Sequence, residues 1–287
     1  MPVSGRTAAR WHLGNALRTL RQTAGVTVEQ VEGARLASRP KLWRIESGQV
    51  RVTVPDVWAL SRFYGADQTI ADDLASWAPK TNDLGLWQEF REVVPDWFKL
   101  YIGLEEIAAR IDVFEDSVLP GELQTPEYAR ALWRGAWPET PAEDSEPHIA
   151  LRLRRQQALF GEPSTPGARR LAVVLGENVL RRQVGGADVM TAQRKHLIGL
   201  AERPGVDIRI LPFAAGAHPA TSGAFRILAF EDLEDPDVVY LELERGAHYL
   251  EGADDVEHYR RMMSRLDEQS VPIGEFRHDH HTVDQGP

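Results

Sequence analysis

Hydrophobic residues recur at helical spacing through the first 78 residues of the chain. Leu13, Leu17 and Leu20 stand four and three positions apart, which predicts an apolar stripe on a helix that ends at Gly25. Three further segments combine such spacing with a polar cap or a proline near their start, or with a glycine at their end: 27–36, 38–48 and 54–65. A fifth helical segment follows at 68–78. The pattern predicts an all-α unit of five short helices.

The second and third of these helices are joined by only about four residues. Thr27 followed by Gln30 matches a capping box, and Ser38 followed by Pro40 marks the start of the third helix. Two short helices with so tight a connection are typical of a helix-turn-helix, whose second helix enters the major groove of DNA. We therefore interpret 38–48 as a recognition helix.

Short runs of β-branched and aromatic residues, the pattern of strands, appear only after Pro166. These runs are 169–177, 206–213, 224–231 and 238–244. Helical patterns surround them at 86–115 (interrupted at Pro95), 126–135, 148–161, 187–202 and 252–270, and 137–147 is an acidic, Pro-rich loop. The fold class expected is α+β overall, with an all-α five-helix domain followed by a mixed α/β domain that has a small sheet.

The helical pattern breaks at 78–84, where proline, asparagine and glycine follow one another. A chain of 287 residues is also long for one domain, given a prior of about 150 residues per domain. We expect a helix-turn-helix domain over 1–80, a mixed α/β effector and dimerisation domain over 84–271, and a polar tail over 272–287.

The two parts differ in charge. The whole chain has a formal net charge of −10, yet residues 1–54 hold nine Arg or Lys and three acidic residues. GC-rich coding would explain why Arg outnumbers Lys, but it does not explain this segregation of charge by sign. A basic amino-terminal part favours a polyanion as its partner.

Cysteine is absent, which excludes disulfides, thiolate zinc sites and cysteine nucleophiles and fits a reducing compartment. The sequence has no run of about 18 apolar residues, and its amino terminus lacks the apolar core of a signal peptide. We expect a cytoplasmic, nucleoid-associated protein without contact to a membrane.

The cations of the third helix lie opposite its apolar positions. Arg39 and Arg44 have the reach and the fork geometry to bind guanine O6 and N7. Lys41 and Arg51 suit phosphates, as do the backbone amides that follow Thr27. A solvated basic face is the alternative, but charge segregation, tight turn and helix cap together favour a DNA-reading surface.

Two residues of the unit have a different expected role. Arg21 and Glu46 lie on the inner sides of the first and third helices, which predicts an ion pair within the domain. Trp43 has two interpretations, contact with a thymine methyl or sugar and packing against the second helix.

The first part of the chain resembles the lambda-repressor-like, XRE-type family of regulators. The resemblance covers about residues 12–78 and rests on the order LGNALRTLRQTAGVTVEQV, SRPKLWRIESGQ and VPDVWALSRFYG. It implies base contacts from Ser38, Arg39, Pro40 and Arg44, contacts near the backbone from Arg18, Lys41 and Arg51, and Arg21–Glu46 as the internal pair.

Two positions depart from the pattern of that family. Val28 stands where many members have a glutamine that reaches DNA, and Glu32 stands where a small alanine normally packs. Pro40 also has no long side chain. Base readout is therefore expected to rest mainly on Arg39 and Arg44.

The second part offers no recognisable catalytic constellation. The sequence after the first expected strand has neither a G-x-G-x-x-G motif nor a Walker lysine, and Ser222 lacks the context of a nucleophile elbow. The histidines of HDHH at 278–281 could hold a stray divalent cation, but a polar tail is the simpler interpretation. We expect no catalytic residue, no metal site and no cofactor.

Seven phrases in the second part nevertheless resemble the effector domain of WhiJ-like regulators of actinomycetes, often described as antitoxin-like. They run in order over about 84–270, from DWFKLYIGLEEIA through VLPGELQTPEYARAL to EHYRRMMSRL. The resemblance implies a transcription factor that is often encoded beside a small partner protein, and it supplies no catalytic residues. The rigid turns at 119–128 and 213–222 suggest a pocket for a ligand or partner near Gln124, Tyr128 and His218.

Together these observations favour the hypothesis that the chain is a sequence-specific, DNA-binding transcriptional regulator. We expect a homodimer on a palindromic operator, because one headpiece alone buries little surface on DNA. Its second domain would sense a ligand or bind a small neighbouring-gene protein. The alternatives are an antitoxin-like protein whose main role is to hold a toxin-like partner, and a small-molecule enzyme with a DNA-binding headpiece.

Overall fold

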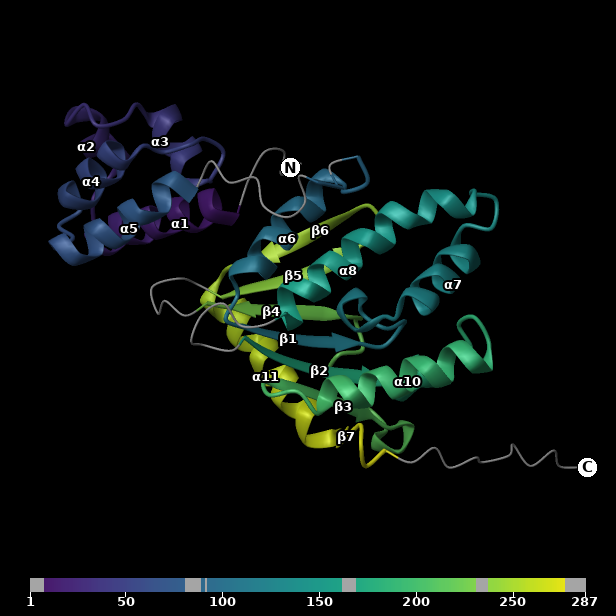
Figure 1. Cartoon of the computed structure of the whole chain (residues 1–287). Helices are drawn as coiled ribbons and strands as arrows, with labels where there is room; N and C mark the ends of the chain where they lie inside the picture. The colour runs from purple at the N-terminus through teal and green to yellow at the C-terminus, as the bar shows by residue number, and fades with distance from the viewer. Residues whose placement is uncertain (1–7, 81–88, 91, 162–168, 231–236, 277–287) are drawn as a thin grey trace, which may run out of the picture.

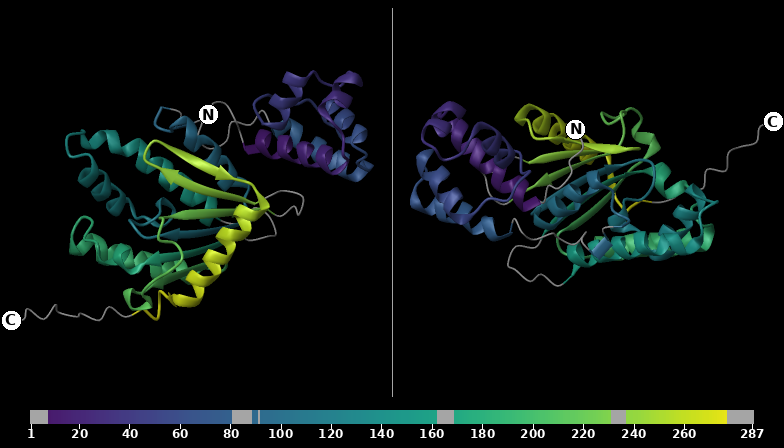
Figure 2. Two further views of the ribbon diagram at one scale, coloured as in Figure 1. Left: turned by 180° about the vertical axis from the view of Figure 1, so that it is seen from behind. Right: turned by 90° about the horizontal axis from the view of Figure 1, so that it is seen from above.

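The computed structural model describes residues 8–80, 89–90, 92–161, 169–230 and 237–276. The chain forms a helical headpiece and a larger domain built around a sheet (Figure 1; Figure 2). Most of the predicted break at 78–84 and the histidines at 278–281 lie outside the described residues.

The headpiece contains the five predicted helices. They are α1 (Ala8–Thr23), α2 (Val28–Gly33), α3 (Arg39–Glu46), α4 (Val54–Phe63) and α5 (Gln68–Lys80). Leu13, Leu17, Leu42 and Ile45 are fully buried in its core, as their spacing predicts. The expected all-α unit is confirmed.

Close contact between α1 and the end of α3 depends on two glycines. A Cβ on Gly14 would lie 2.3 Å from the carbonyl oxygen of Ile45, and a Cβ on Gly48 would lie 2.8 Å from Cα of Trp11. Gly48 also has φ +66°, a conformation that L side chains rarely adopt. Gly48, the glycine at the end of the recognition helix, therefore also allows α1 to pack close to α3.

The second domain alternates helices and strands. Its helices are α6 (Asp96–Ile107), α7 (Pro126–Ala136), α8 (Glu146–Phe160), α9 (Glu177–Arg181), α10 (Ala187–Ala201) and α11 (Ala253–Gln269), with short 3₁₀ turns at Gly121–Leu123, Ala142–Ser145 and Phe213–Ala215. Its strands are β1 (Arg110–Glu115), β2 (Arg170–Gly176), β3 (Val206–Leu211), β4 (Phe225–Ala229), β5 (Val238–Leu243), β6 (Gly246–Leu250) and β7 (Val271–Pro272). The mixed α/β domain is confirmed.

The sheet is larger than the sequence suggested. It has seven strands in the order β6-β5-β4-β1-β2-β3-β7, with β1, β2 and β3 parallel and the other pairs antiparallel. The helical interpretation of 86–115 was wrong at its end, where β1 forms. This strand lies in the middle of the sheet and is buried on both faces, so its residues show no clear alternation. β6 and β7 are short strands at the two edges of the sheet. Each is stabilised by pairing with one neighbouring strand.

Helices cover both faces of the sheet. Helices α6, α7, α8 and α10 lie over one face, and α11 lies over the other (Figure 1; Figure 2). The first face packs Val113 and Tyr240 against Tyr101 of α6, while the second packs Phe114 against the α11 side of the domain. This is a three-layer arrangement with two hydrophobic cores separated by the sheet.

The carboxyl-terminal end of the described chain completes this domain. Pro272 pairs with Arg209 of β3, and Ile273 is buried against the main core. Residues 272–276, which the sequence assigned to the polar tail, therefore belong to the packed domain. None of the described helices is long and apolar enough to cross a membrane.

The two domains meet at the start of α1 (Figure 1). The indole Nε1 of Trp11 donates a hydrogen bond of 2.8 Å to Glu251 Oε1, just after β6, and its ring centroid lies 6.1 Å from that of Phe230. Trp11 is 3% exposed, so a headpiece residue is buried partly by the second domain.

Candidate nucleic-acid interface

The third helix presents the expected residues to solvent. Ser38 caps α3 by accepting a hydrogen bond from the backbone N–H of Lys41, and Pro40 lies in the first turn. Leu42 and Ile45 point into the core, whereas Arg39 and Arg44 are exposed. Both arginines of α3 are therefore accessible to solvent.

Trp43 is on this exposed face as well. Trp43 is 59% exposed, so it is not buried in the headpiece core. Contact of Trp43 with DNA stays a prediction.

The turn between α2 and α3 has a strained backbone. Arg35 has φ +61°, the only non-glycine residue with positive φ among those that the structure describes. The backbone N–H of Leu36 donates a hydrogen bond of 3.3 Å to the carbonyl oxygen of Val31, across the turn that contains Arg35. The left-handed residue brings α3 back across α2 within a few residues, as a helix-turn-helix requires.

Two cations of the interface have acidic neighbours that the sequence interpretation missed. Arg39 forms an ion pair with Glu29 of α2, and Lys41 Nζ lies 3.2 Å from Asp56 Oδ1 of α4. Hydrogen bonds from its own backbone and from Thr27, together with the charge of Arg39, lower the pKa of Glu29. Burial opposes ionisation of Asp56, but hydrogen bonds from Thr53 and Lys41 outweigh it and lower its pKa. Both carboxylates are thus charged at neutral pH.

These pairs are open to solvent. The side chains of Arg39 and Glu29 are 62% and 64% exposed, so water screens their attraction. Arg39 can therefore exchange Glu29 for a nucleic-acid acceptor at little cost.

Glu32 stands where the family that the headpiece resembles has a small alanine, and the structure explains this difference. Its side chain is exposed and Oε1 accepts a 3.2 Å hydrogen bond from the backbone N–H of Arg39. It satisfies one of the amides at the start of α3, a position where negative charge is favourable. Glu32 thus supports the recognition helix instead of packing in the core.

The remaining predicted contact residues differ in accessibility. Thr27 caps α2 through a capping box with Gln30, as predicted, and remains exposed. Arg18 and Arg51 are exposed, whereas Val28 is half-buried against the headpiece core. The structure therefore assigns Val28 mainly to packing, and DNA contacts of the exposed residues stay a prediction.

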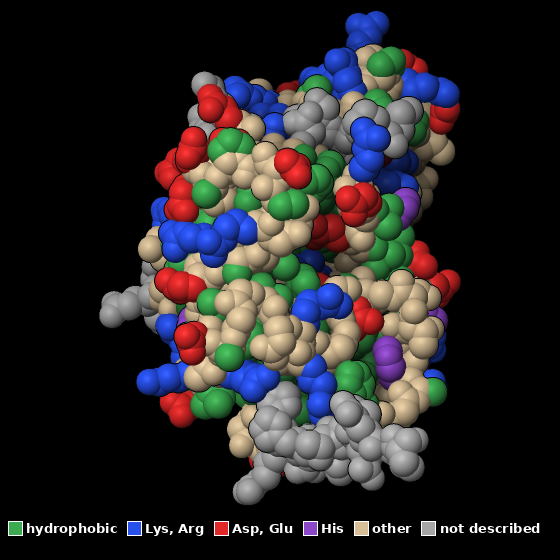
Figure 3. Space-filling view, turned by 90° about the vertical axis from the view of Figure 1, so that its right-hand side faces the viewer, with side chains coloured by type: hydrophobic (Ala, Val, Ile, Leu, Met, Phe, Trp, Pro, Cys, Tyr) green, Lys and Arg blue, Asp and Glu red, His purple; other side chains and the backbone are tan. Residues whose placement is uncertain are grey.

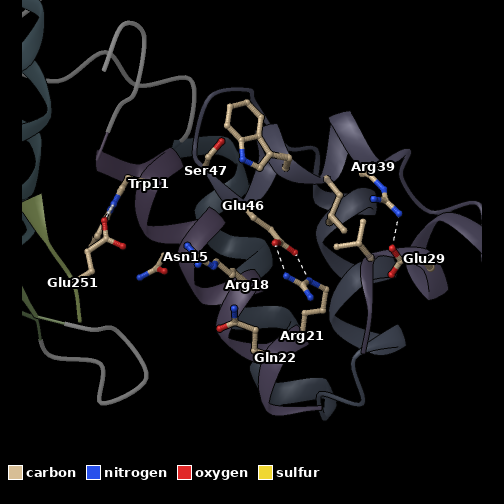
Figure 4. A pocket seen from close by; sticks show the side chains of 13 residues that line it. Trp11, Asn15, Arg18, Arg21, Gln22, Glu29, Arg39, Glu46, Ser47 and Glu251 are labelled. Atoms are coloured by element: carbon tan, nitrogen blue, oxygen red, sulfur yellow. Dashed lines mark hydrogen bonds and ion pairs between the residues drawn. The ribbon is translucent and has the colours of Figure 1, made fainter. Parts of the chain in front are cut away.

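Arg21 and Glu46 form the internal ion pair that the sequence indicated. Arg21 Nε lies 2.6 Å from Glu46 Oε1 and a terminal nitrogen lies 2.9 Å from Oε2, while the other donates to Val26 O. The hydrogen bonds from Arg21 to Glu46 raise the pKa of Arg21 further, although burial opposes this. The pair lies in a hollow of about 430 Å³ between α1, α2 and α3, with Trp11 and Glu251 at one end and Arg39 with Glu29 at the other (Figure 4).

The three residues proposed for a pocket in the second domain do not come together. Gln124 and Tyr128 are buried, and both contact the backbone of Leu119, through its carbonyl oxygen and its N–H respectively. His218 lies against Phe114 on the opposite face of the sheet. Gln124 and Tyr128 therefore hold a turn in place, and the proposed pocket is wrong as a single site.

Comparison with protein families assigns both parts of the chain. Residues 12–74 match a helix-turn-helix domain, and residues 98–277 match a domain of unknown function, DUF5753. Searches of curated proteins and of solved structures found no significant match.

The second match covers more than half of the chain and includes the whole seven-stranded sheet. The chain therefore belongs to the DUF5753 family and carries a helix-turn-helix domain in front of the domain that defines it.

Proposed function

We propose that the protein is a sequence-specific DNA-binding transcriptional regulator of the XRE type. The observation that carries the proposal is the face of α3, where Arg39, Trp43 and Arg44 are exposed on a helix capped for entry into a groove. In this proposal Arg39 and Arg44 contact guanines, and Lys41 and Arg51 contact phosphates.

The proposed regulator acts as a homodimer on a palindromic operator in the cytoplasm. A headpiece of five short helices contacts only one half-site, and two half-sites supply the affinity that specific regulation needs. The DUF5753 domain would hold the two copies together and receive a signal, from a ligand or from a small partner protein of the kind that WhiJ-like regulators of actinomycetes have. The proposal contains no catalytic step.

The experiment is selection of bound DNA from a random pool with the wild-type chain, Arg39→Ala and Arg44→Ala. Each variant should lose about 1–3 kcal/mol of binding free energy and relax base preference at one position in each half-site. Arg62→Ala is the matched control, because Arg62 is exposed on α4 and bonds to Gln68 of α5 instead of lying on α3. Full base preference in both α3 variants would show that another surface reads the DNA.

A salt titration distinguishes side chains that contact phosphates from side chains that contact bases. Lys41→Ala and Arg51→Ala should weaken binding to every sequence alike and lower the salt slope by about one each. Light scattering of the same complexes measures the number of chains per operator. One chain on a non-repeated site would contradict the homodimer.

A further inference from the structure

A cleft of about 740 Å³ lies at the end of the sheet where β1 ends and β4 begins. Figure 3 shows this end of the molecule, hollowed near its centre, with acidic side chains inside the hollow and hydrophobic ones around it. Ligands of sheets with parallel strands commonly bind outside the carboxyl ends of those strands, and Glu115, the last residue of β1, lines the cleft. The volume is that of a site for a small organic molecule.

Aromatic and apolar side chains form much of the wall of the cleft. Trp97 approaches from α6, Phe225 from β4 and Tyr259 with Met262 from α11. The rings of Phe225 and Tyr259 pack edge to face with their centroids 5.0 Å apart. Trp97 and Tyr259 are half-buried, so part of each ring is open to solvent. Because the face of an aromatic ring is negative, this wall suits an apolar body and also tolerates a positive charge.

Three carboxyl groups line the same cleft, those of Glu115, Glu242 and Glu244. The backbone N–H groups of Asp116 and Ser117 donate hydrogen bonds of 3.1 and 3.0 Å to Glu115 Oε1, whereas Oε2 has no hydrogen bond with any residue that the structure describes. Burial raises the pKa of Glu115, because the protein replaces only part of the solvation that its charged form loses. A cation in the cleft would favour that charged form.

Arg226 is the one guanidinium in the lining of the cleft, and its charge is already matched within the protein. It forms ion pairs of 3.6 Å with Glu122 and with Glu242, and the ring of Tyr101 lies 5.4 Å from its central carbon. Glu122 is buried and is not part of the lining. The other basic side chain of the lining, His258, is exposed on α11. With Arg226 balanced by Glu122, the three carboxyl groups leave the cleft negative.

The two carboxyl groups nearest to Arg226 face the same part of the cleft. Glu242 pairs with this arginine, and Glu115 interacts with it electrostatically. An ammonium can donate hydrogen bonds to both carboxyl groups, and bonds between charged partners are stronger than neutral ones. An anion would instead meet three like charges. The lining therefore combines the two features that bind an organic cation, acidic groups and aromatic rings.

We propose that this cleft binds a small organic ammonium with an aromatic or apolar body, whose nitrogen pairs with Glu115 and Glu242. Strand β5, which carries Glu242, pairs with β6, and Glu251 just after β6 holds Trp11 of the headpiece. The ligand would thus act on the part of the domain that contacts α1. Its use as a signal rests on the proposed function, whereas binding itself does not.

The test uses the full-length chain without DNA and three probes: phenethylamine, 2-phenylethanol, which lacks the charge, and propylamine, which lacks the ring. Saturation-transfer NMR detects binding, and calorimetry measures Kd for the wild type, Glu115→Gln, Glu242→Gln and Glu268→Gln. Glutamine at position 115 keeps an oxygen that can accept the two backbone hydrogen bonds. Glu268 is the matched control, because it is exposed on α11 and does not line the cleft.

Phenethylamine should bind the wild type more tightly than either of the other probes does. Glu115→Gln should weaken it about tenfold, because a hydrogen bond to a half-buried charged group is lost. Glu242→Gln should weaken it about threefold, because the side chain of Glu242 is 49% exposed and water screens its charge. Glu268→Gln should leave Kd unchanged.

Equal binding of phenethylamine and 2-phenylethanol would show that the cleft does not recognise charge, and equal binding of propylamine would show only a general attraction of cations to an acidic chain. Either result would overturn the proposal, as would an unchanged Kd in Glu115→Gln or no binding of phenethylamine to the wild type. If Glu115→Gln does not fold, Glu242→Gln decides. The random-pool selection uses no probe, so a failure there would contradict the proposed function and leave the cleft result intact.

Discussion

Single residues explain how an acidic protein can keep a cationic reading surface. Arg39 and Lys41 each have a carboxylate beside them, Glu29 and Asp56, and the first of these pairs is largely exposed. Exposed pairs contribute little stability, so such acids lower non-specific affinity without fixing the cations in place. The acids would thereby act in DNA discrimination rather than in folding.

Replacing Glu29 tests this role. Glu29→Gln removes the competing carboxylate and should tighten binding to an unrelated duplex about threefold at low salt, with a smaller effect at high salt. Fluorescence anisotropy at two salt concentrations measures it. The control is Glu257→Gln, which changes an exposed residue of α11 and should leave binding unchanged. An equal gain in both variants would indicate a general charge effect instead.

Two partly buried histidines make the second domain sensitive to acid. Burial lowers the pKa of His148, with a further contribution from the charge of Arg152, and burial lowers the pKa of His196. The unfolded chain therefore binds protons at a higher pH than the folded chain does, near the ordinary histidine pKa of about 6.5. Stability from these groups is present above that pH and is lost as the pH falls toward the folded pKa values.

Melting temperatures at about pH 7.5 and pH 5.5 should reveal this dependence. Tm should fall on acidification, and the fall should be smaller in the double variant His148→Gln, His196→Gln. The His258→Gln variant provides the comparison, since His258 is exposed on α11. A pH dependence that survives unchanged in the double variant would assign it to the carboxylates.

At the scale of elements, the headpiece depends on how closely α1 approaches α3. Gly14 and Gly48 allow a backbone contact that any side chain would obstruct. The reading helix is therefore held by a backbone fit as well as by its apolar side chains.

Gly14→Ala should push α3 away from α1 and cost about 2 kcal/mol of headpiece stability. Hydrogen exchange measured by mass spectrometry on peptides from 8–80 detects this loss in the full chain. Gly33→Ala is the control, because a Cβ there meets nothing within 4 Å and should be neutral or slightly stabilising. Equal exchange in both variants would mean that α1 and α3 can separate freely.

The elements also show where sequence patterns succeed. The helices with a polar cap and an apolar stripe, such as α2 and α3, were predicted with their caps, because those signals are local. Strand β1 was missed, because a short central strand buried on both faces has no alternation and follows a helix after two residues. Only its pairing with β2 and β4 distinguishes it from that helix.

At the scale of the whole molecule, Trp11 connects the helix-turn-helix headpiece to the DUF5753 domain that we propose as the sensor. The side chain of Trp11 extends from α1 to Glu251 and packs near Phe230. A partly buried hydrogen bond to a carboxylate at this place restrains the orientation of the headpiece.

Trp11→Phe should loosen this restraint, since the ring is kept in part and the N–H is lost. The chain has no cysteine, so Ser76→Cys on α5 and Ala150→Cys on α8, both exposed, give two unique spin labels. The distance distribution between them should broaden in the variant. An unchanged distribution would show that other contacts, such as those between α1 and α6, are enough to fix the two domains.

The sequence by itself determined the helix-turn-helix, its caps, the internal pair of Arg21 with Glu46 and the cationic face of α3. Each of these depends on neighbours within a few residues or on a pattern along one helix. The tertiary structure alone decided the seven-stranded sheet, the acids beside Arg39 and Lys41, and the cleft around Arg226. Those features join residues that are distant in sequence, such as Tyr101, Glu122 and Arg226, and no local pattern encodes which of them meet.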